Sequence, residues 1–401
     1  MKYFFNLLLQ INLSILSYFV KKDKMILFGC DRGYGFRGNT KFLYLYFNNE
    51  EKQQTEKYKY LWTTKDKKVL NLLQKKELPV VYAYSLKGFL AILRAKKLLV
   101  EVSSKDVSYV GTFLNGNFSV INTWHGAGFK QSSIFDHDYN KKNSFLFISF
   151  FYKIFEYFFK NDLHKTIFTA SSSIIKKEYE SFFPGAEVII TGFPRNDIFF
   201  KESNSCLFFN YANELNLKKY SLIILYAPTF RDFNSETIPF SKSFLKKLDA
   251  FLIANNYIFF IKKHNMEKNL EIDNIYSNIK DISRDILDIQ ELLPNIDVLI
   301  SDYSSVVTDF SISHKPILFY IYDYENYQKK NRSLYFDIKD LTPGPFCYKE
   351  EELFNYLNNL DWFNESNYQE NYLRFVDKFH YYQDGNSCKR VENLIEREEK
   401  I

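Results

Sequence analysis

Two polar segments that directly follow apolar runs contain side chains suited to chemistry. The first, Asn122–Lys130, places His125 between Trp124 and Gly126. Histidine is the side chain best suited to proton transfer near neutral pH. The glycines Gly126 and Gly128 let the backbone approach a ligand closely, and free amides there can bind an anion. The segment therefore indicates a catalytic histidine or, alternatively, a histidine that makes only structural hydrogen bonds.

The second segment, Asp297–Phe310, is the most specific in the chain. An apolar run leads into Ser304 and Ser305, and an apolar helical pattern follows. Serines are good N-cap residues, and a helix start offers unpaired amides and the positive end of its dipole. That combination binds phosphate groups, although a plain capped helix would show the same pattern. Asp309, one turn further on, is placed to meet a ribose hydroxyl or to hydrogen-bond with its own neighbours.

Basic side chains follow two further apolar runs. Arg231 comes shortly after the run Leu222–Tyr226, where it can clamp a phosphate bidentately or be solvated or paired with a carboxylate. A second group, at the end of the apolar run Tyr257–Lys262, consists of Lys262, Lys263 and His264. It would bring three cationic or donor groups to the same edge of the sheet as Arg231. No DxD-like carboxylate pair and no His/Asp ligand set stands out in the sequence. We therefore expect no required metal ion or resident cofactor.

Short apolar strands that alternate with helical patterns must position these residues. The first half of the chain predicts strands at Met25–Phe28, Tyr60–Thr63, Val80–Tyr82, Leu98–Val102 and Val120–Thr123, with helices at Thr40–Asn48, Lys67–Lys76 and Ser85–Ala95. A second set of strands is predicted at Val188–Thr191, Leu222–Tyr226, Tyr257–Lys262, Val298–Ser301 and Ile317–Tyr320. This alternation is typical of doubly wound α/β sheets, whose ligands bind outside the carboxyl ends of the strands.

The length of 401 residues favours two domains. The turn-rich segment Gly192–Asp197 separates the two sets of strands and is suited to a domain junction. We therefore predict two facing Rossmann-like domains with an active-site cleft between them. The expected divisions are an amphipathic helix at 1–21, an N-terminal domain at 22–191, a C-terminal domain at 192–375 and a helical tail at 376–401.

The overall composition restricts the class of protein. With 46% hydrophobic and 25% charged residues the chain is globular, and its formal net charge of +5 fits an anionic substrate or a membrane surface but is too weak to indicate nucleic acid. The cysteines Cys30, Cys206, Cys347 and Cys388 are far apart and form no CxxC pair. A disulfide framework and a structural zinc site are therefore not predicted, and a reducing cytoplasm fits best.

Two segments have the pattern of amphipathic helices. In residues 4–20 the polar positions recur on one helical face, and in residues 144–161 the side chains of Ser149, Lys153, Glu156 and Lys160 share a face opposite many aromatics. Each pattern fits a helix that lies on a bilayer or a helix that packs on its own protein. Neither segment clearly contains the run of about 20 apolar residues that a membrane-spanning helix needs.

Taken together, the motifs resemble the CDP-glycerol glycerophosphotransferase family, which builds teichoic-acid-type and capsular polyol-phosphate polymers. The matching stretches are Arg37–Lys41, Tyr84–Lys87, Asn122–Lys130, Gly192–Asp197, Leu225–Arg231, Lys262–His264, Asp297–Asp309, Pro316–Tyr320 and Thr342–Pro345. The resemblance covers nearly the whole chain. At Ala127 and Gly128 the chain departs from the Thr and Pro that the family commonly has after Trp-His-Gly. We therefore expect the ligand contacts of this loop, and with them the choice of acceptor, to differ from the family pattern.

The resemblance implies a GT-B fold, a CDP-glycerol donor, a lipid-linked or polymer acceptor and peripheral attachment to the cytoplasmic face of the cell membrane. It implies that His125 takes the acceptor proton and that His264 faces the donor diphosphate. The implied CDP-polyol-binding residues are Gly126, Ala127, Gly128, Phe129, Arg195, Pro228, Thr229, Arg231, Lys262, Lys263, Ser304, Ser305 and Asp309. An acceptor hydroxyl would attack the phosphorus nearest the glycerol, and CMP would leave.

Three other functions are compatible with the same motifs. One is a CDP-ribitol ribitolphosphotransferase of the same family, and another is a GT-B glycosyltransferase that uses a nucleotide sugar. The third is an inactive scaffold of a membrane assembly, which the presence of His125, His264 and Arg231 together argues against. A homo-oligomer is compatible with the sequence, and we expect no nucleic-acid partner.

Overall fold

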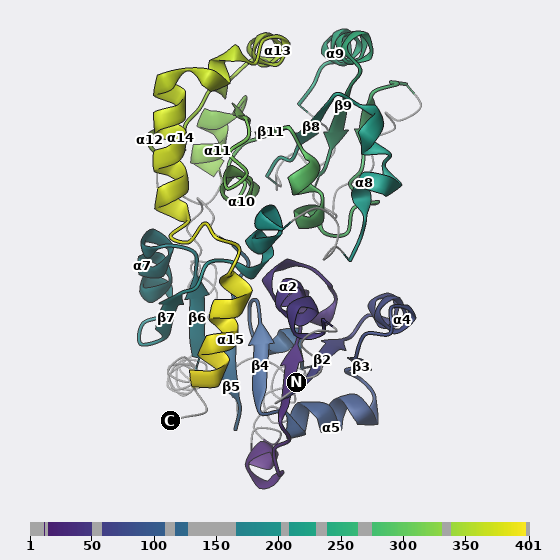
Figure 1. The fold of residues 1–401 in the computed structure, drawn as a ribbon, viewed down its shortest axis with the longest axis vertical. Helices are drawn as coiled ribbons and strands as arrows, with labels where there is room; N and C mark the ends of the chain where they lie inside the picture. Colours follow the sequence, from purple (N-terminus) through teal and green to yellow (C-terminus); the bar gives the residue numbers. More distant parts are fainter. Residues whose placement is uncertain are drawn as a thin grey trace, which may run out of the picture. The chain divides into compact units, whose positions relative to one another are not determined.

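Two separate units make up the chain (Figure 1). The computed structural model describes residues 12, 15–49, 58–108, 117–126, 166–201, 208–229, 239–263, 275–330 and 338–397. The first unit comprises Met1–His125, Ser132–Phe200 and Tyr381–Ile401, and the second comprises Gly126–Gln131 and Lys201–His380.

The first unit is built on a seven-stranded parallel sheet with the strand order β3-β2-β1-β4-β5-β6-β7. The strands are β1 (Met25–Phe28), β2 (Lys59–Thr64), β3 (Val80–Tyr82), β4 (Lys97–Val100), β5 (Ser119–Asn122), β6 (Thr166–Ala170) and β7 (Glu187–Ile190). All residues of β1, β4 and β6 are buried. Strands that are covered on both faces are usually continuous apolar runs, as β1 is.

Helices α2 (Gly38–Phe47), α4 (Lys67–Lys75), α5 (Leu86–Arg94) and α7 (Ser173–Phe182) connect these strands. The first turns of α4 and α5 are capped by side chains, because Asp66 accepts from the Lys68 amide and Ser85 accepts from the Gly88 amide. In α2, most side chains are buried, including those of the polar residues near its start.

Helix α15 (Ser387–Arg397) follows the whole second unit in the sequence but packs in the first unit, against α2 and the 3-10 segment η3 (Pro194–Phe200). The buried carboxylate of Asp197 in η3 accepts hydrogen bonds from the amides of Ser387 (2.9 Å) and Cys388 (2.8 Å) at the start of α15. A carboxylate at this end of a helix satisfies unpaired amides and interacts favourably with the helix dipole. Asp197 thereby fixes the start of α15 to η3.

The second unit is built on a six-stranded parallel sheet with the order β10-β9-β8-β11-β12-β13. Its strands are β8 (Leu222–Tyr226), β9 (Tyr257–Ile261), β10 (Ile279–Asp281), β11 (Val298–Ser301), β12 (Ile317–Tyr320) and β13 (Phe346–Cys347). Its helices are α8 (Tyr211–Glu214), α9 (Lys242–Asn255), α10 (Val306–Ser311), α11 (Tyr324–Lys330), α12 (Ile338–Leu341), α13 (Glu350–Asn358) and α14 (Ser366–Phe379).

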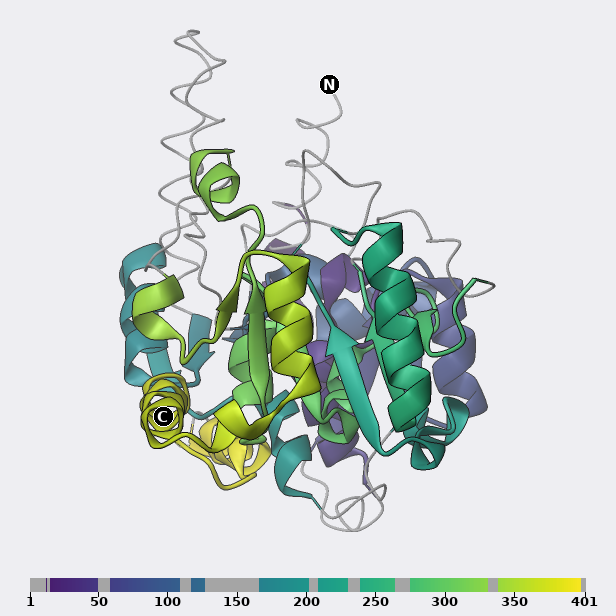
Figure 2. The same cartoon turned by 90° about the horizontal axis from the view of Figure 1, so that it is seen from above.

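Helices α9 and α13 lie side by side over one face of the second sheet (Figure 2). Their buried residues, among them Leu248 and Leu353, form one apolar core with residues of β8, β9 and β11. The rings of Phe251 and Phe354 meet edge to face at 5.3 Å between centroids. Helices α10 and α14 contact each other, and α10 contacts β11.

The predicted fold class is confirmed, since both units are α/β with parallel sheets. The strand set predicted for Val188–Thr191 is wrong, because β7 pairs with β6 in the first sheet, although the predicted N-terminal domain at 22–191 includes this strand. The strand β6, which contains two threonines, was not predicted, and without it β7 has no partner in the first set. The two units divide the chain after Phe200, beyond the predicted junction, and α15 belongs to the first unit.

Both predicted amphipathic segments fall largely or wholly outside the described residues. Residues 144–161 are outside, and of residues 4–20 the structure describes Asn12 and 15–20. Among the described residues, no helix is both long and apolar enough to cross a bilayer. Cys30, Cys347 and Cys388 are buried free thiols, whereas Cys206 is outside the described residues.

The anchor at Asp197 leads to a stability prediction. We expect Asp197→Ala to lower the free energy of unfolding of the first unit by roughly 2–4 kcal/mol, because it leaves two buried amides without their charged acceptor. Urea unfolding followed by circular dichroism measures this change.

A matched control is Glu370→Ala, which removes an exposed i,i+4 ion pair with Arg374. Such surface pairs contribute less than about 1 kcal/mol, so this variant should unfold near the wild-type midpoint. Equal midpoints for the Asp197 and Glu370 variants would refute the anchoring role of Asp197.

Candidate functional site

His125 lies just beyond the carboxyl end of β5, in a segment with an unusual backbone. Trp124 has a φ of 50°, in the left-handed region that side chains other than glycine rarely adopt. The Trp124 amide donates to Oδ1 of Asn122 at 2.9 Å, and its buried ring contacts Phe183 edge to face at 5.1 Å. The His125 ring lies 4.6 Å from the Trp124 ring, and the residue is exposed. The packing of Trp124 therefore fixes the position from which the His125 side chain projects.

Arg195 is the predicted site residue that the structure places beside His125. It lies in η3, is buried, and donates from Nη1 to the backbone oxygen of His125 at 2.9 Å. The backbone amide of Arg195 donates to Oδ1 of Asn39 at 3.2 Å. Nδ2 of Asn39 in turn donates to the carbonyl oxygens of Thr123 (3.2 Å) and Trp124 (3.1 Å). We did not predict a role for Asn39.

The environment of His125 favours the neutral imidazole. The pKa of His125 is lowered to about 4, chiefly because surrounding protein removes water from the charged form, and in addition because the Arg195 guanidinium repels it. The ring is neutral at pH 7 in consequence, and one of its nitrogens has a lone pair that can accept a proton. Because His125 is exposed, a substrate can reach the imidazole.

A buried carboxyl group lies beneath the start of α2. Glu101, just past β4, accepts from the backbone amide of Thr40 at 3.3 Å. The pKa of Glu101 is raised to about 8, first by burial and then by the nearby carboxylate of Asp106. A Cβ atom added to Gly38, which has a φ of 69°, would lie 2.1 Å from Oε1 of Glu101. Only glycine fits at this position, so the approach of α2 to β4 depends on it.

In the second unit, the predicted serines follow β11. Asp302, also just past β11, accepts from the Thr229 amide at 2.8 Å, which joins the carboxyl ends of β8 and β11. Ser304 accepts from the Val306 amide at 3.4 Å, whereas the Ser305 side chain makes no capping hydrogen bond. Helix α10 is only 6 residues long. The predicted serine caps are therefore weaker than expected, and Asp302, which we did not single out, holds this region together.

The two lysines after β9 are both hydrogen-bonded to Ser283. Nζ of Lys262 donates to the Ser283 carbonyl at 2.9 Å, and the Lys263 amide donates to Oγ of Ser283 at 2.8 Å. Lys263 is buried and Lys262 half-buried. The charge of Lys262 is thus used in part to attach the end of β9 to the segment after β10.

The structure describes some of the remaining predicted site residues and not others. Pro228 and Thr229 are half-buried, as are Ser304 and Ser305, whereas Gly126 and Asp309 are buried. Outside the described residues lie Ala127, Gly128, Phe129, Arg231 and His264. In the parts of the chain that the structure describes, no group of three or more His, Cys, Asp and Glu side chains is arranged to hold a metal ion.

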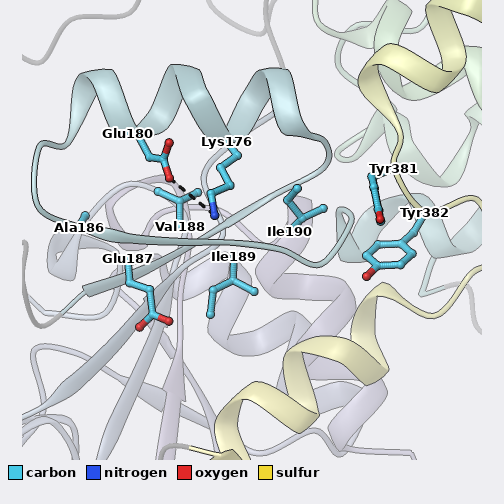
Figure 3. A pocket seen from close by; sticks show the side chains of 9 residues that line it. All are labelled: Lys176, Glu180, Ala186, Glu187, Val188, Ile189, Ile190, Tyr381 and Tyr382. Carbon is cyan, nitrogen blue, oxygen red and sulfur yellow. Dashed lines mark ion pairs between the residues drawn. The ribbon is translucent and has the colours of Figure 1, made fainter.

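A pocket of about 460 Å³ lies elsewhere in the first unit, at the edge strand β7 (Figure 3). Helix α7 contributes Lys176 and Glu180, which form an ion pair at 3.7 Å, and Tyr381 and Tyr382 line the pocket from the other side. None of the predicted site residues lines it.

Solved structures with the same fold include the wall teichoic acid polymerase TagF, with a TM-score of 0.73 and 23% identity over 95% of this chain and 90% of that one. A second is the UDP-GlcNAc 2-epimerase from Neisseria meningitidis, with a TM-score of 0.54 and 13% identity over 93% of this chain and 99% of that one. These likenesses concern the fold. Together with the two parallel sheets, they confirm the predicted GT-B class.

Similar sequences include the teichoic acid glycerol-phosphate transferase of Staphylococcus aureus, which is 27% identical over 92% of this chain and 91% of the relative. The teichoic acid glycerol-phosphate primase of Bacillus subtilis is 37% identical, and that match spans about half of each protein (52% and 51%). The family model for CDP-glycerol:poly(glycerophosphate) glycerophosphotransferases matches residues 11–397. The predicted resemblance is therefore confirmed, and this chain belongs to the CDP-glycerol:poly(glycerophosphate) glycerophosphotransferase family.

Proposed function

We propose that this protein transfers glycerol phosphate from CDP-glycerol to a hydroxyl group of a membrane-linked acceptor in teichoic-acid-type polymer synthesis. The acceptor oxygen forms a bond to the phosphorus nearest the glycerol, the bond from that phosphorus to CMP breaks, and CMP leaves with its electron pair. The observation that carries this proposal is His125, a neutral and accessible imidazole at the carboxyl edge of the first sheet, in a chain of this family. The acceptor proton passes to His125.

The state of His125 supports its role as the general base. A base must be unprotonated before the reaction, and the pKa of about 4 keeps the imidazole in that form at neutral pH, although it also makes the ring a weaker base than an ordinary histidine. Phosphoryl transfer needs little covalent chemistry from the protein, so positioning of the acceptor oxygen and neutralisation of phosphate charge provide most of the rate. Arg195 and Asn39 hold the backbone from which the imidazole projects.

We assign the donor diphosphate to the second unit, near Thr229, Ser304 and Ser305. Asp302 ties the Thr229 amide to the end of β11, so these three residues lie at the carboxyl ends of two neighbouring strands. Open α/β sheets bind their ligands at that edge. Arg231 and His264, which follow β8 and β9 in the sequence, would supply the positive charge and a hydrogen-bond donor.

Glycerol is the polyol that the comparisons favour. Some relatives named for glycerol phosphate match over more than nine tenths of this chain, namely the S. aureus transferase at 92% and a Bacillus spizizenii polymerase at 94%, whereas the B. subtilis primase matches over 52%. The S. aureus ribitol-phosphate polymerase TarL matches over 52% of it. A panel of CDP-glycerol, CDP-ribitol and nucleotide sugars, followed by CMP or UDP release, tests this choice.

Peripheral attachment to the cytoplasmic face of the membrane is the localisation we propose. In the described part of the N-terminal helix, Ser17 is buried and its Oγ accepts from the Asn117 amide at 2.9 Å. The apolar side chains of Ile15, Leu16 and Phe19 are exposed instead, with Phe19 at 82%. An apolar face that points away from its own protein fits a bilayer surface.

His125→Ala tests the base. We expect CMP release to fall by on the order of 100-fold or more, because the acceptor oxygen loses its proton acceptor. Binding of CDP-glycerol, measured by calorimetry, should stay near the wild-type value. The control is His314→Asn, which changes an exposed histidine in the second unit and should leave turnover intact. Near-normal turnover of His125→Ala would exclude His125 as the base.

The charge of Arg195 leads to a pH prediction. For wild type, kcat/KM should fall with acidification only near pH 4, where His125 becomes protonated. Replacing Arg195 with Met removes the repulsion that disfavours the imidazolium, so the pKa of His125 rises and the acid limb moves to higher pH.

CMP release measured between about pH 3.5 and 8 checks both expectations, with Arg374→Met, which changes an exposed arginine of α14, as the control. A wild-type acid limb at about 6.5, the ordinary value for histidine, would contradict the assigned environment of His125.

The exposed N-terminal face gives a membrane prediction. We expect Leu16→Ser combined with Phe19→Ser to lower partitioning onto vesicles of anionic phospholipid by about tenfold or more, since each buried side chain of this size contributes about 1.5–3 kcal/mol. Sedimentation with the vesicles measures the change. Leu373→Ser, on the exposed side of α14, is the matched control. Unchanged partitioning of the double variant would rule out this face as the contact.

A further inference from the structure

The side chain of Asn39 is fully buried near the start of α2, and it makes three hydrogen bonds to backbone groups from other parts of the first unit. Its amide nitrogen Nδ2 donates to the carbonyls of Thr123 and Trp124, and its Oδ1 accepts from the Arg195 amide, at distances of 3.1–3.2 Å. These partners lie 84, 85 and 156 residues away in the sequence. One side chain therefore joins α2, the segment after β5 and η3.

The same segment is held a second time by Arg195. Its guanidinium donates to the carbonyl of His125, so three consecutive carbonyls, those of residues 123 to 125, are bound by Asn39 and Arg195. Arg195 is itself positioned by Asn39 through its backbone amide. Asn39 thus acts on the His125 segment directly and through Arg195.

The backbone at Trp124 explains why such a restraint is needed. A residue other than glycine at a φ of 50° costs roughly 1–3 kcal/mol and persists only where the surroundings impose it. Released from the two carbonyl contacts, the segment would relax, and the imidazole of the next residue would move with it. Misplacement of a catalytic group by about 1 Å can cost on the order of 100-fold in rate.

The pattern of donors and acceptors requires an amide side chain. Asparagine supplies two N–H donors and a carbonyl acceptor on one short side chain, which matches two carbonyls and one amide. Aspartate has the same shape but no donor, so its second oxygen would face the two carbonyl oxygens.

We propose that Asn39 is a positioning residue for the transfer reaction, which holds the His125 imidazole in its reactive position both directly and through Arg195. This inference rests on the proposed role of His125 as the base. We expect Asn39→Asp and Asn39→Ala to lower kcat for CMP release by about 10-fold to 100-fold, with the dissociation constant of CDP-glycerol near wild type.

The control residue is Asn48, which caps the other end of α2 and donates from Nδ2 to the Tyr44 carbonyl at 2.9 Å. Asn48→Asp makes the same chemical change in the same helix without touching the His125 segment. Its kcat should stay within about twofold of wild type. Thermal unfolding of each variant shows whether the fold is retained, and Asn39→Asp, which keeps the size of the side chain, replaces Asn39→Ala if the latter unfolds.

A double-mutant cycle separates positioning from general stability. If Asn39 acts through His125, Asn39→Asp should cost 10-fold or more in wild type but less than about twofold in the His125→Ala background. A purely structural role would cost the same factor in both backgrounds, and that result would overturn the inference. If His125→Ala alone keeps its turnover, His125 is not the base and the proposed function of this residue is wrong. That result is distinct from equal effects of Asn39→Asp in the two backgrounds, which would contradict only the positioning role of Asn39.

Discussion

Every described strand pair in both sheets is parallel, and this constraint decides where polar side chains can gather. Parallel strands all end at the same edge of their sheet, so the segments after β1, β4 and β5 meet at one edge of the first unit. His125, Glu101 and the start of α2 gather there for that reason. The same rule brings Thr229 and Asp302 together in the second unit.

The fold could be predicted largely because its buried strands are apolar runs. Strands β1, β3, β8, β11 and β12 have the predicted bounds. Strand β6 escaped prediction because threonines interrupt its apolar pattern, although all its residues are buried. A buried threonine in a central strand is recognisable only when its tertiary surroundings are known. The error in placing β7 follows from that one omission, since β6 is its partner.

Sequence alone suggests site residues where chemistry follows from residue type, and not where a role depends on a distant partner. His125 was proposed from the sequence because histidine is suited to proton transfer and follows a predicted strand, where doubly wound folds bind their ligands. Asn39 was not, because its significance comes from carbonyls 84 and 85 residues away. Lys262 shows the converse, since its charge is obvious in the sequence while its bond to the Ser283 carbonyl is not. A basic residue can serve a substrate or the backbone, and only the fold distinguishes the two.

Helix α15 has a consequence for how the protein is made. It follows the second unit in the sequence, yet its first amides bind Asp197 in the first unit. On a ribosome, the first unit is synthesised early but lacks this helix until all residues of the second unit have been added. Its buried η3 surface, which carries Arg195, stays uncovered throughout that interval. The η3 segment, which carries Arg195, therefore gains its contacts with α15 only after the whole second unit has been synthesised.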